Sequence, residues 1–220
     1  FEEERYQVNI ERLESCITPK TKAIIINSPN NPSGSCLTVE TMKKIAEVAE
    51  KHDLVVISDE IYTIYSFDHP FVPFSSLPGM KERTVTINSF SKDYVMTGWR
   101  IGAIIAPTQI IDTVRRISEN LVFSTPAVSQ RAALHALRCR KEVQPALSKI
   151  FRERIFYAAE RINKIPNMHV IYPPMGTFYL FVNIKDTGLT SEEAAMKIFE
   201  ETHVVMIPGN GFGRCGEGYL

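Results

Sequence analysis

The 220-residue sequence lacks long hydrophobic runs and an excess of either charge. No apolar run approaches the roughly 18 residues of a membrane-spanning helix, and no signal peptide is visible. Its 25 lysines and arginines balance its 25 aspartates and glutamates. This balance gives no electrostatic reason to expect binding to nucleic acid or to an anionic membrane surface. We therefore expect an ordinary globular protein with a cytoplasmic location.

Cysteine is also scarce. The four cysteines are Cys16, Cys36, Cys139 and Cys215, and no two of them have C-x-x-C spacing. We interpret them as separate thiols in a reducing compartment, because neither a disulfide frame nor a zinc site is indicated. The first residue is Phe1, not methionine, and the last residues resemble the approach to a further strand. We therefore expect a piece of a longer protein.

Short apolar runs are present throughout the first half of the chain. The runs at 23–27, 54–58 and 84–88 predict buried strands, and the segment that begins at Thr38 has helical spacing. This β-α-β order predicts parallel strands with a right-handed crossover. The run at 100–106 follows the third strand too closely for a helical crossover, so we predict a buried, antiparallel fourth strand.

Helical periodicity dominates the sequence from Pro107 onward and predicts a long helix near 142–165. This helix is long enough to bridge two domains. We therefore predict a partial large domain over residues 1–147 and a partial small α+β domain over residues 148–220.

The small domain is predicted to contain strands and one further helix. The runs at 169–172 and 177–182 predict a hairpin. Ser191 is the expected cap of a helix, and the run at 204–207 predicts a last strand.

Polar side chains follow the predicted parallel strands at their carboxyl ends, where open α/β sheets bind ligands. Asn31 follows the first strand, and Asp59 follows the second with Tyr62 one turn later. Each has an ordinary alternative role, as a turn residue, a helix cap and a half-buried packing residue respectively. We interpret the neighbouring Glu60 as solvent-facing or structural.

The third strand leads into a lysine. Ser89, Ser91, Lys92 and Arg100 are grouped at its end and just beyond it. A partly desolvated lysine near other cations can lose its proton near neutral pH and attack a carbonyl. Serine hydroxyls and a guanidinium group suit a phosphate. Together these features suggest pyridoxal 5'-phosphate (PLP), whose ring cation would be matched by Asp59.

Three segments resemble the class I/II aminotransferases of PLP fold type I, the aspartate aminotransferase family. They are Asn30-Asn31-Pro32-Ser33-Gly34, Ser58-Asp59-Glu60-Ile61-Tyr62, and Ser89-Phe90-Ser91-Lys92 with Arg100. The resemblance extends to 176–179 and 207–213 and so covers essentially the whole chain. It implies an α/β fold, with a mixed, mostly parallel sheet flanked by helices in the large domain and a small α+β C-terminal domain, both incomplete.

The resemblance implies a role for each candidate residue. Lys92 forms the internal aldimine with PLP and then moves a proton between the substrate α-carbon and the cofactor. Asp59 pairs with the protonated pyridine nitrogen, and Asn31 and Tyr62 donate hydrogen bonds to the ring oxygen. The residues implied to bind the phosphate are Ser89, Ser91 and Arg100.

The implied activity is transfer of an amino group between an amino acid and a 2-oxo acid by a homodimer. Two alternatives stay open. C–S lyases and related PLP enzymes share Lys92 and Asp59. A PLP-binding sensor domain of a transcription regulator would need a basic helix-turn-helix domain before Phe1.

The resemblance also indicates which parts of the site this sequence does not contain. The family's glycine-rich phosphate loop, ring-stacking aromatic residue and partner-subunit tyrosine would precede Phe1. Its arginine for the substrate carboxylate would follow Leu220. We therefore expect the isolated 220-residue chain to bind PLP poorly and to be inactive in transamination.

Overall fold

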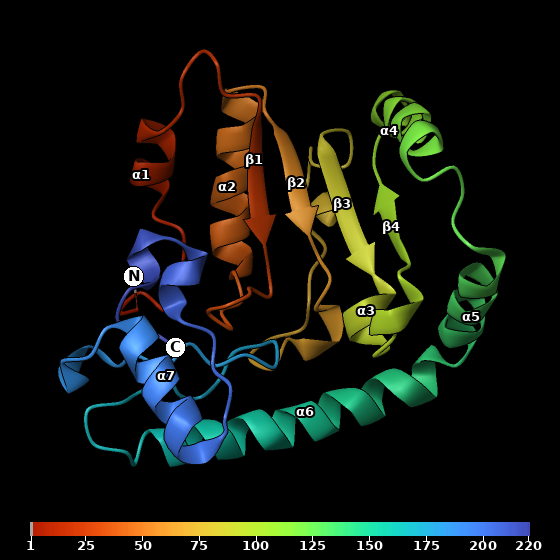
Figure 1. The fold of residues 1–220 in the computed structure, drawn as a ribbon. Coiled ribbons are helices and arrows are strands. Elements are labelled where there is room, and N and C mark those ends of the chain that lie inside the picture. Colours follow the sequence, from red (N-terminus) through yellow and green to blue (C-terminus); the bar gives the residue numbers. More distant parts are fainter. Residues whose placement is uncertain (1) are drawn as a thin grey trace.

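A four-stranded mixed sheet forms the centre of the structure, a computed structural model that describes residues 2–220 (Figure 1). The strands are β1 (Ala23–Asn27), β2 (Val55–Asp59), β3 (Thr84–Ser89) and β4 (Gly102–Ile105), in that order across the sheet. Strands β1, β2 and β3 are parallel, and β4 is antiparallel to β3. The prediction of a mostly parallel sheet with an antiparallel fourth strand is confirmed.

The strand directions bring several chain segments to one edge of the sheet. In Figure 1, β1, β2 and β3 point toward α6 (Arg140–Ile162), and β4 runs back from that edge. In the register of the last pair, Ser89 at the end of β3 lies opposite Gly102 at the start of β4. Residues that follow β3 and residues that precede β4 therefore lie at the same edge.

Helix α2 (Val39–Lys51) connects β1 to β2 and covers one face of the sheet. It begins after Thr38, whose hydroxyl accepts the backbone N–H of Thr41 at 3.1 Å. Its apolar face packs on the sheet in one core cluster, in which Ile45 and Val56 are fully buried. Complete burial of an isoleucine side chain contributes about 1.5–3 kcal/mol, so this face holds the helix against the sheet.

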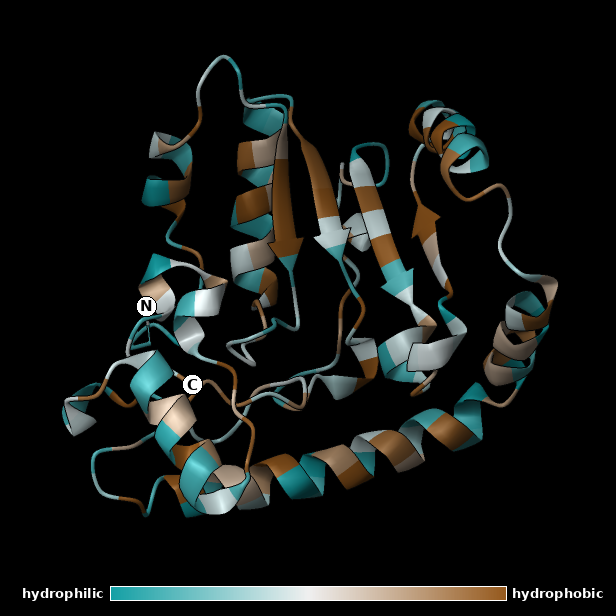
Figure 2. Ribbon diagram, in the orientation of Figure 1, coloured by the Kyte–Doolittle hydropathy of each residue, from teal (hydrophilic) through white to brown (hydrophobic). Residues whose placement is uncertain are grey.

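The prediction of buried strands holds for only one face of β1 and is wrong for β4. In β1, Ile24 and Ile26 are buried, but Ile25 between them is 74% exposed. All four residues of β4 are exposed. Successive side chains on a strand point to opposite faces, and α2 packs on only one face of the sheet, which leaves Ile25 exposed. Within residues 2–220, strand β4 contributes no residue to the core cluster that contains α2. Figure 2 shows apolar residues in succession along β1, so composition alone does not distinguish the two faces.

Further helices are α1 (Ile10–Ser15), α4 (Thr108–Leu121), α5 (Ala127–Arg138) and α7 (Ser191–Thr202). Helix α6 has 23 residues, which corresponds to a length of about 35 Å. It confirms the predicted long helix, with bounds shifted toward the N-terminus. Of the helices within residues 2–220, none combines the length and apolar character that crossing a bilayer requires.

A second buried cluster joins the end of α6 to α7. It contains Ala159, Val170, Val182, Ile184, Ala194, Ala195 and Leu220. Helix α7 begins at Ser191, but its cap is Thr190, which forms a reciprocal capping box with Glu193. The predicted cap at Ser191 is therefore wrong by one residue. The domain division between residues 147 and 148 stays a prediction.

Two predicted strand features are wrong. The predicted hairpin is reduced to one antiparallel bridge between His169 and Asn183, and between these residues the chain crosses to the loop after β2, where Gly176 forms a bridge with Ser66. The run at 204–207 has no regular structure, and Val205 is 77% exposed. An apolar run can form a strand only where a neighbouring backbone supplies hydrogen bonds, and periodicity does not reveal that neighbour.

The four cysteines differ in burial, and this difference gives a first prediction. Cys36 is buried, and burial raises the pKa of its thiol to about 11, whereas Cys16 and Cys215 are exposed. The thiolate is the reactive form, so at pH 8 iodoacetamide should alkylate the exposed pair at least about tenfold faster than Cys36. Peptide mass spectrometry measures the rates, and equal rates in the native protein would contradict this burial.

Candidate active site

Three segments meet at the sheet edge where β1, β2 and β3 end. They are the loop at 28–34, the stretch from Glu60 through the short 3-10 helix η1 (Thr63–Tyr65), and the short helix α3 (Phe90–Asp93). All the site residues predicted from the sequence lie on these segments or beside them. Parallel strands deliver their following loops to one edge, which explains the arrangement.

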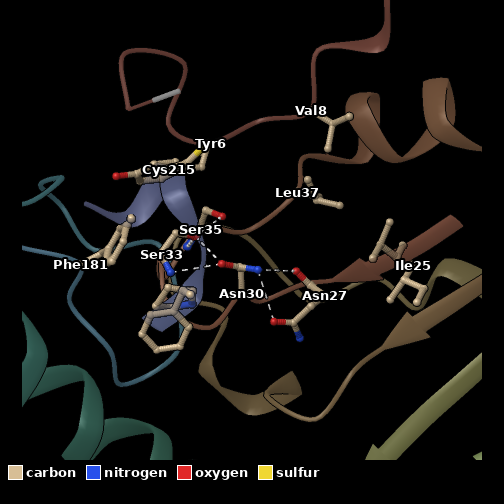
Figure 3. A pocket seen from close by; sticks show the side chains of 14 residues that line it. Tyr6, Val8, Ile25, Asn27, Asn30, Ser33, Ser35, Leu37, Phe181 and Cys215 are labelled. Atoms are coloured by element: carbon tan, nitrogen blue, oxygen red, sulfur yellow. Dashed lines mark hydrogen bonds between the residues drawn. The ribbon is translucent and has the colours of Figure 1, made fainter. Parts of the chain in front are cut away.

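The loop after β1 is shaped by its own side chains. The Asn27 Oδ1 atom accepts the backbone N–H of Asn31 at 2.9 Å. The Asn30 amide donates to Asn27, and the Ser33 hydroxyl donates to Asn30 at 2.6 Å (Figure 3). Asparagine and serine side chains that bond to nearby backbone stabilise such tight turns. These contacts fix the position from which Asn31 extends.

A cavity of about 400 Å³ lies beside this loop (Figure 3). Its lining includes Tyr6, Ile25, Asn27, Phe181 and Cys215. Neither Lys92 nor Asp59 belongs to that lining, so this cavity differs from the site predicted from the sequence.

Asn31 and Tyr62 are brought together as predicted. The Asn31 amide donates to the Tyr62 hydroxyl at 3.4 Å, and that hydroxyl donates to the Tyr179 hydroxyl at 3.3 Å. Tyr62 is only 2% exposed. Burial raises its pKa, and the bond to Tyr179 raises it further. The phenol therefore stays protonated at neutral pH and can both donate and accept a hydrogen bond.

Asp59 ends β2 with a carboxylate oxygen that lacks a partner. Its Oδ1 atom is buried and forms no hydrogen bond within residues 2–220. Burial raises the pKa of this carboxyl, and a hydrogen bond from the Ile61 backbone opposes the shift. A buried acceptor without a partner is rare in folded proteins. A cation or a charged N–H donor against Oδ1 would stabilise the ionised form.

The adjacent Glu60 has a different environment. It is 4% exposed and accepts the Phe74 backbone N–H at 2.9 Å and the Ser58 hydroxyl at 3.0 Å. We predicted that Glu60 is either solvent-facing or structural. The first alternative is wrong, and the second is correct. Asp59 and Glu60 thus form a pair in which one buried carboxylate is satisfied and the other is not.

Lys92 is the third residue of α3 and is half-buried. The Ser89 hydroxyl caps this helix by accepting the backbone N–H of Ser91 at 3.1 Å. The Lys92 carbonyl accepts the Tyr65 hydroxyl at 3.0 Å, and its Nζ atom lies 5.9 Å from the centre of the Phe178 ring. The amine therefore lies against the aromatic group that also contacts Tyr62.

Arg100 lies at the same edge as Lys92, but its side chain is directed elsewhere. Its backbone has a φ of 49° just before β4, and its guanidinium donates to the Thr97 carbonyl at 3.1 Å. Among the described residues, no hydrogen bond joins it to Ser89 or Ser91. The backbone thus brings the predicted phosphate-binding residues, Ser89, Ser91 and Arg100, to the same sheet edge. The Arg100 guanidinium, however, is exposed.

Two aromatic residues of the site were not predicted to belong to it. The Tyr62 ring packs edge-on against Phe178 and Tyr179, with ring centres 5.6 and 5.8 Å apart. Both lie in the run at 177–182, which predicts one arm of a hairpin. The available signal was the motif 176–179 within the family resemblance, but its spacing gives no indication of contact with Tyr62, more than a hundred residues earlier.

Gly176 allows this aromatic segment to approach the loops. A Cβ atom there would lie 2.5 Å from the Cys36 sulfur and 2.6 Å from the Tyr65 carbonyl oxygen. The Thr177 N–H donates to that same Tyr65 oxygen at 2.8 Å. Only glycine therefore fits without displacing the segment that carries Phe178.

Gly176→Ala should lower the free energy of unfolding by about 1–3 kcal/mol, because the added methyl overpacks a closed contact. The matched control is Gly211→Ala, since a Cβ there meets no atom within 4 Å. We expect the control to change stability by less than about 0.5 kcal/mol. Urea unfolding measures both variants, and equal effects would show that the approach at Gly176 is not tight.

Comparison with known proteins gives consistent matches to one family. The family model for aminotransferase class I and II matches residues 1–220. A putative aminotransferase of Bacillus subtilis, YugH, is 42% identical over 94% of this chain and 53% of its own length. Aromatic-amino-acid aminotransferase 2 of Thermococcus litoralis is 39% identical over 100% of this chain and 57% of its own.

Solved structures give the same result. The aromatic aminotransferase from Pyrococcus horikoshii OT3 superimposes with a TM-score of 0.94 at 37% identity, covering 100% of this chain and 59% of that one. The chain thus spans a little more than half the length of the relatives that it matches. With the family match over its whole length, the chain belongs to the class I and II aminotransferases.

Proposed function

We propose that the protein containing this chain is a PLP-dependent aminotransferase that moves an amino group between an amino acid and a 2-oxo acid. The principal support is the buried, unpartnered Oδ1 of Asp59 at the sheet edge that also carries Lys92. PLP is a pyridine aldehyde: the carboxylate of Asp59 suits its ring nitrogen, and the amine of Lys92 suits its aldehyde group. The aminotransferase names of the relatives are consistent with this proposal.

The residues present fit PLP. Asp59 has a free acceptor for a protonated ring nitrogen. Asn31 and Tyr62 already share a hydrogen bond and would hold the ring oxygen together. For the phosphate, the chain offers Ser89, Ser91 and the exposed guanidinium of Arg100.

When bound, PLP supplies an electron sink for the charge that develops at the substrate α-carbon. Asp59 would keep the ring nitrogen protonated, because its raised pKa returns toward the ordinary value when a cation is placed beside it. In this proposal Lys92 Nζ is both the amine that holds the cofactor and the group that carries the proton to and from the α-carbon. Such proton transfer by a positioned side chain typically contributes about 10²–10⁴-fold in rate.

The hydroxyl of Tyr62 positions the cofactor rather than exchanging protons. Its pKa is raised, so it remains a hydrogen-bond donor throughout the physiological range. Its ring packs edge-on against Phe178 and Tyr179, whose own ring centres lie 4.7 Å apart. The phenol would therefore be fixed before any ligand arrives, which limits the entropy lost on binding.

The reaction class can be tested directly on the whole protein. Incubation with PLP, a panel of amino acids and 2-oxoglutarate should produce glutamate and the matching 2-oxo acid in equal amounts. Release of pyruvate and ammonia from cysteine or cystathionine, without glutamate, would instead identify a C–S lyase. Failure to turn over any amino acid would favour a PLP-binding sensor domain.

A homodimer and a cytoplasmic location complete the proposal. The homodimer rests on the resemblance to aminotransferases, and the location rests on the composition and the cysteine pattern. Sedimentation equilibrium of the whole protein measures the first, and fractionation of the source cells measures the second.

A further inference from the structure

We infer that Asp93 is a positioning residue that joins the Lys92 segment to the Tyr62 segment. The inference rests on the proposed function, because it concerns the two residues that would hold PLP from different loops. Asp93 is 3% exposed, and none of the roles described above uses its carboxylate.

Helix α3 cannot fix Lys92 by itself. It has four residues, and a helix this short is far below the length that is stable in isolation. Ser89 caps its beginning. The direction in which Lys92 extends therefore depends on contacts made by the end of the helix, where Asp93 lies.

Asp93 connects α3 to the beginning of η1. Its Oδ2 atom accepts a hydrogen bond from the Thr63 hydroxyl. The backbone N–H groups of Thr63 and Ile64 also favour its charged form. Tyr62 occupies the cap position of η1 and supplies no capping hydrogen bond from its side chain. Asp93 Oδ2 thus provides an acceptor at the start of a helix that Tyr62 does not cap, while its Oδ1 atom is buried without a hydrogen-bond partner among the described residues.

A second bond joins the same two elements. The Tyr65 hydroxyl donates to the Lys92 carbonyl at 3.0 Å, and Tyr65 is fully buried. Lys92 immediately precedes Asp93, and Tyr62 immediately precedes Thr63. The two bonds therefore fix the backbone beside both candidate cofactor residues, so that a shift of one segment requires a shift of the other.

The charge of Asp93 strengthens this connection. Burial raises its pKa to about 6, so the group is mostly ionised at pH 8. Hydrogen bonds to an ionised acceptor are about twice as strong as neutral ones. Asparagine has nearly the same shape and keeps one carbonyl acceptor, whereas alanine keeps none.

The test compares variants of the whole protein at pH 8. Asp93→Ala removes the acceptor, Thr63→Val removes the donor, and Asp93→Asn retains an acceptor for the Thr63 hydroxyl. The matched control is Thr84→Val, because Thr84 is buried on β3 but its hydroxyl has no partner among the described residues. Two quantities are measured: the thermal midpoint, and the rate at which borohydride traps PLP on Lys92.

We expect Asp93→Ala and Thr63→Val to trap PLP on Lys92 between about tenfold and a hundredfold more slowly than the wild type. Asp93→Asn should restore the rate to within about threefold, and Thr84→Val should leave it unchanged. Transamination should show the same order, with the larger change in kcat and the smaller in KM. If Asp93→Ala does not fold, Thr63→Val and Asp93→Asn decide the question.

A lower thermal midpoint with unchanged trapping in the folded variants would assign Asp93 to packing alone and overturn the inference. Equal loss in Asp93→Asn and Asp93→Ala would overturn the hydrogen-bonded connection. Absence of trapping on Lys92 in the wild type would instead overturn the proposed function, and the inference with it. These outcomes distinguish the two failures.

Discussion

Replacing Lys92 with alanine should reduce transamination by the whole protein by at least about 10²–10⁴-fold, which is the range for loss of a positioned proton-transfer group. The amine is also the group that would hold the cofactor, so the true loss should lie at the upper end. Lys92→Arg should not restore activity, because a guanidinium keeps its proton and cannot act as a nucleophile. Coupled assay of 2-oxo acid formation measures both variants.

Lys164→Ala is the control for the lysine substitutions. Lys164 lies in an exposed ion pair with Glu160, four residues earlier in the chain. Pairs of this kind contribute only about 0.3–0.5 kcal/mol. The control should therefore retain wild-type turnover. Retention of activity within about tenfold by Lys92→Ala would exclude this lysine from the reaction.

The second large effect is expected at Asp59. Asp59→Asn preserves the shape but removes the charge opposite the ring nitrogen, so turnover should fall by about 10²–10³-fold, as for other preorganised electrostatic groups. Glu60→Gln is the matched control. The amide of this variant keeps an oxygen for the Phe74 N–H that Glu60 now binds. Its turnover should stay within about fivefold of wild type.

In the absence of PLP, Asp59→Asn should not lower the thermal stability, although the same substitution lowers turnover. The pKa of this carboxyl is raised in the folded state, so the folded protein binds the proton more tightly than the unfolded chain does. Ionisation above that pKa therefore destabilises the cofactor-free fold. At pH 7.5, Asp59→Asn should have an equal or higher thermal midpoint than wild type. Similar, modest losses of turnover in Asp59→Asn and Glu60→Gln would refute the role assigned to Asp59 opposite the ring nitrogen.

The sheet could be predicted from the sequence because its signals are local. Three apolar runs, each followed by polar turn residues, predicted β1, β2 and β3, and the short connection before Arg100 predicted the reversal into β4. The faces of the strands could not be predicted in the same way. Ile25 and its neighbours are equally apolar, but only α2 decides which of them is buried.

The second half of the chain was harder to predict, because its contacts are long-range. The segment around Gly176 pairs with Ser66, more than a hundred residues earlier, and the predicted hairpin retains only the bridge between His169 and Asn183. Apolar alternation predicts extended backbone but carries no information about the pairing partner. The same is true of 204–207, which is apolar and yet unpaired.

For the candidate site, chemistry at the strand ends was enough to select Lys92, Asp59, Tyr62 and Asn31. It could not select Asp93, Phe178 or Tyr179, whose positions depend on Thr63 and Tyr62 across 30 to 117 residues. Nor could it predict the rotamer of Arg100, which donates to Thr97. A residue's type indicates which reaction it can support, but its direction depends on its neighbours in the fold.

The most direct test of the account is the site of PLP attachment. The whole protein is saturated with PLP at pH 8, reduced with borohydride, digested, and mapped by mass spectrometry. We expect one pyridoxyl group per chain, on the peptide that contains Lys92. A pyridoxyl group on another lysine, with Lys92 unmodified, would contradict it.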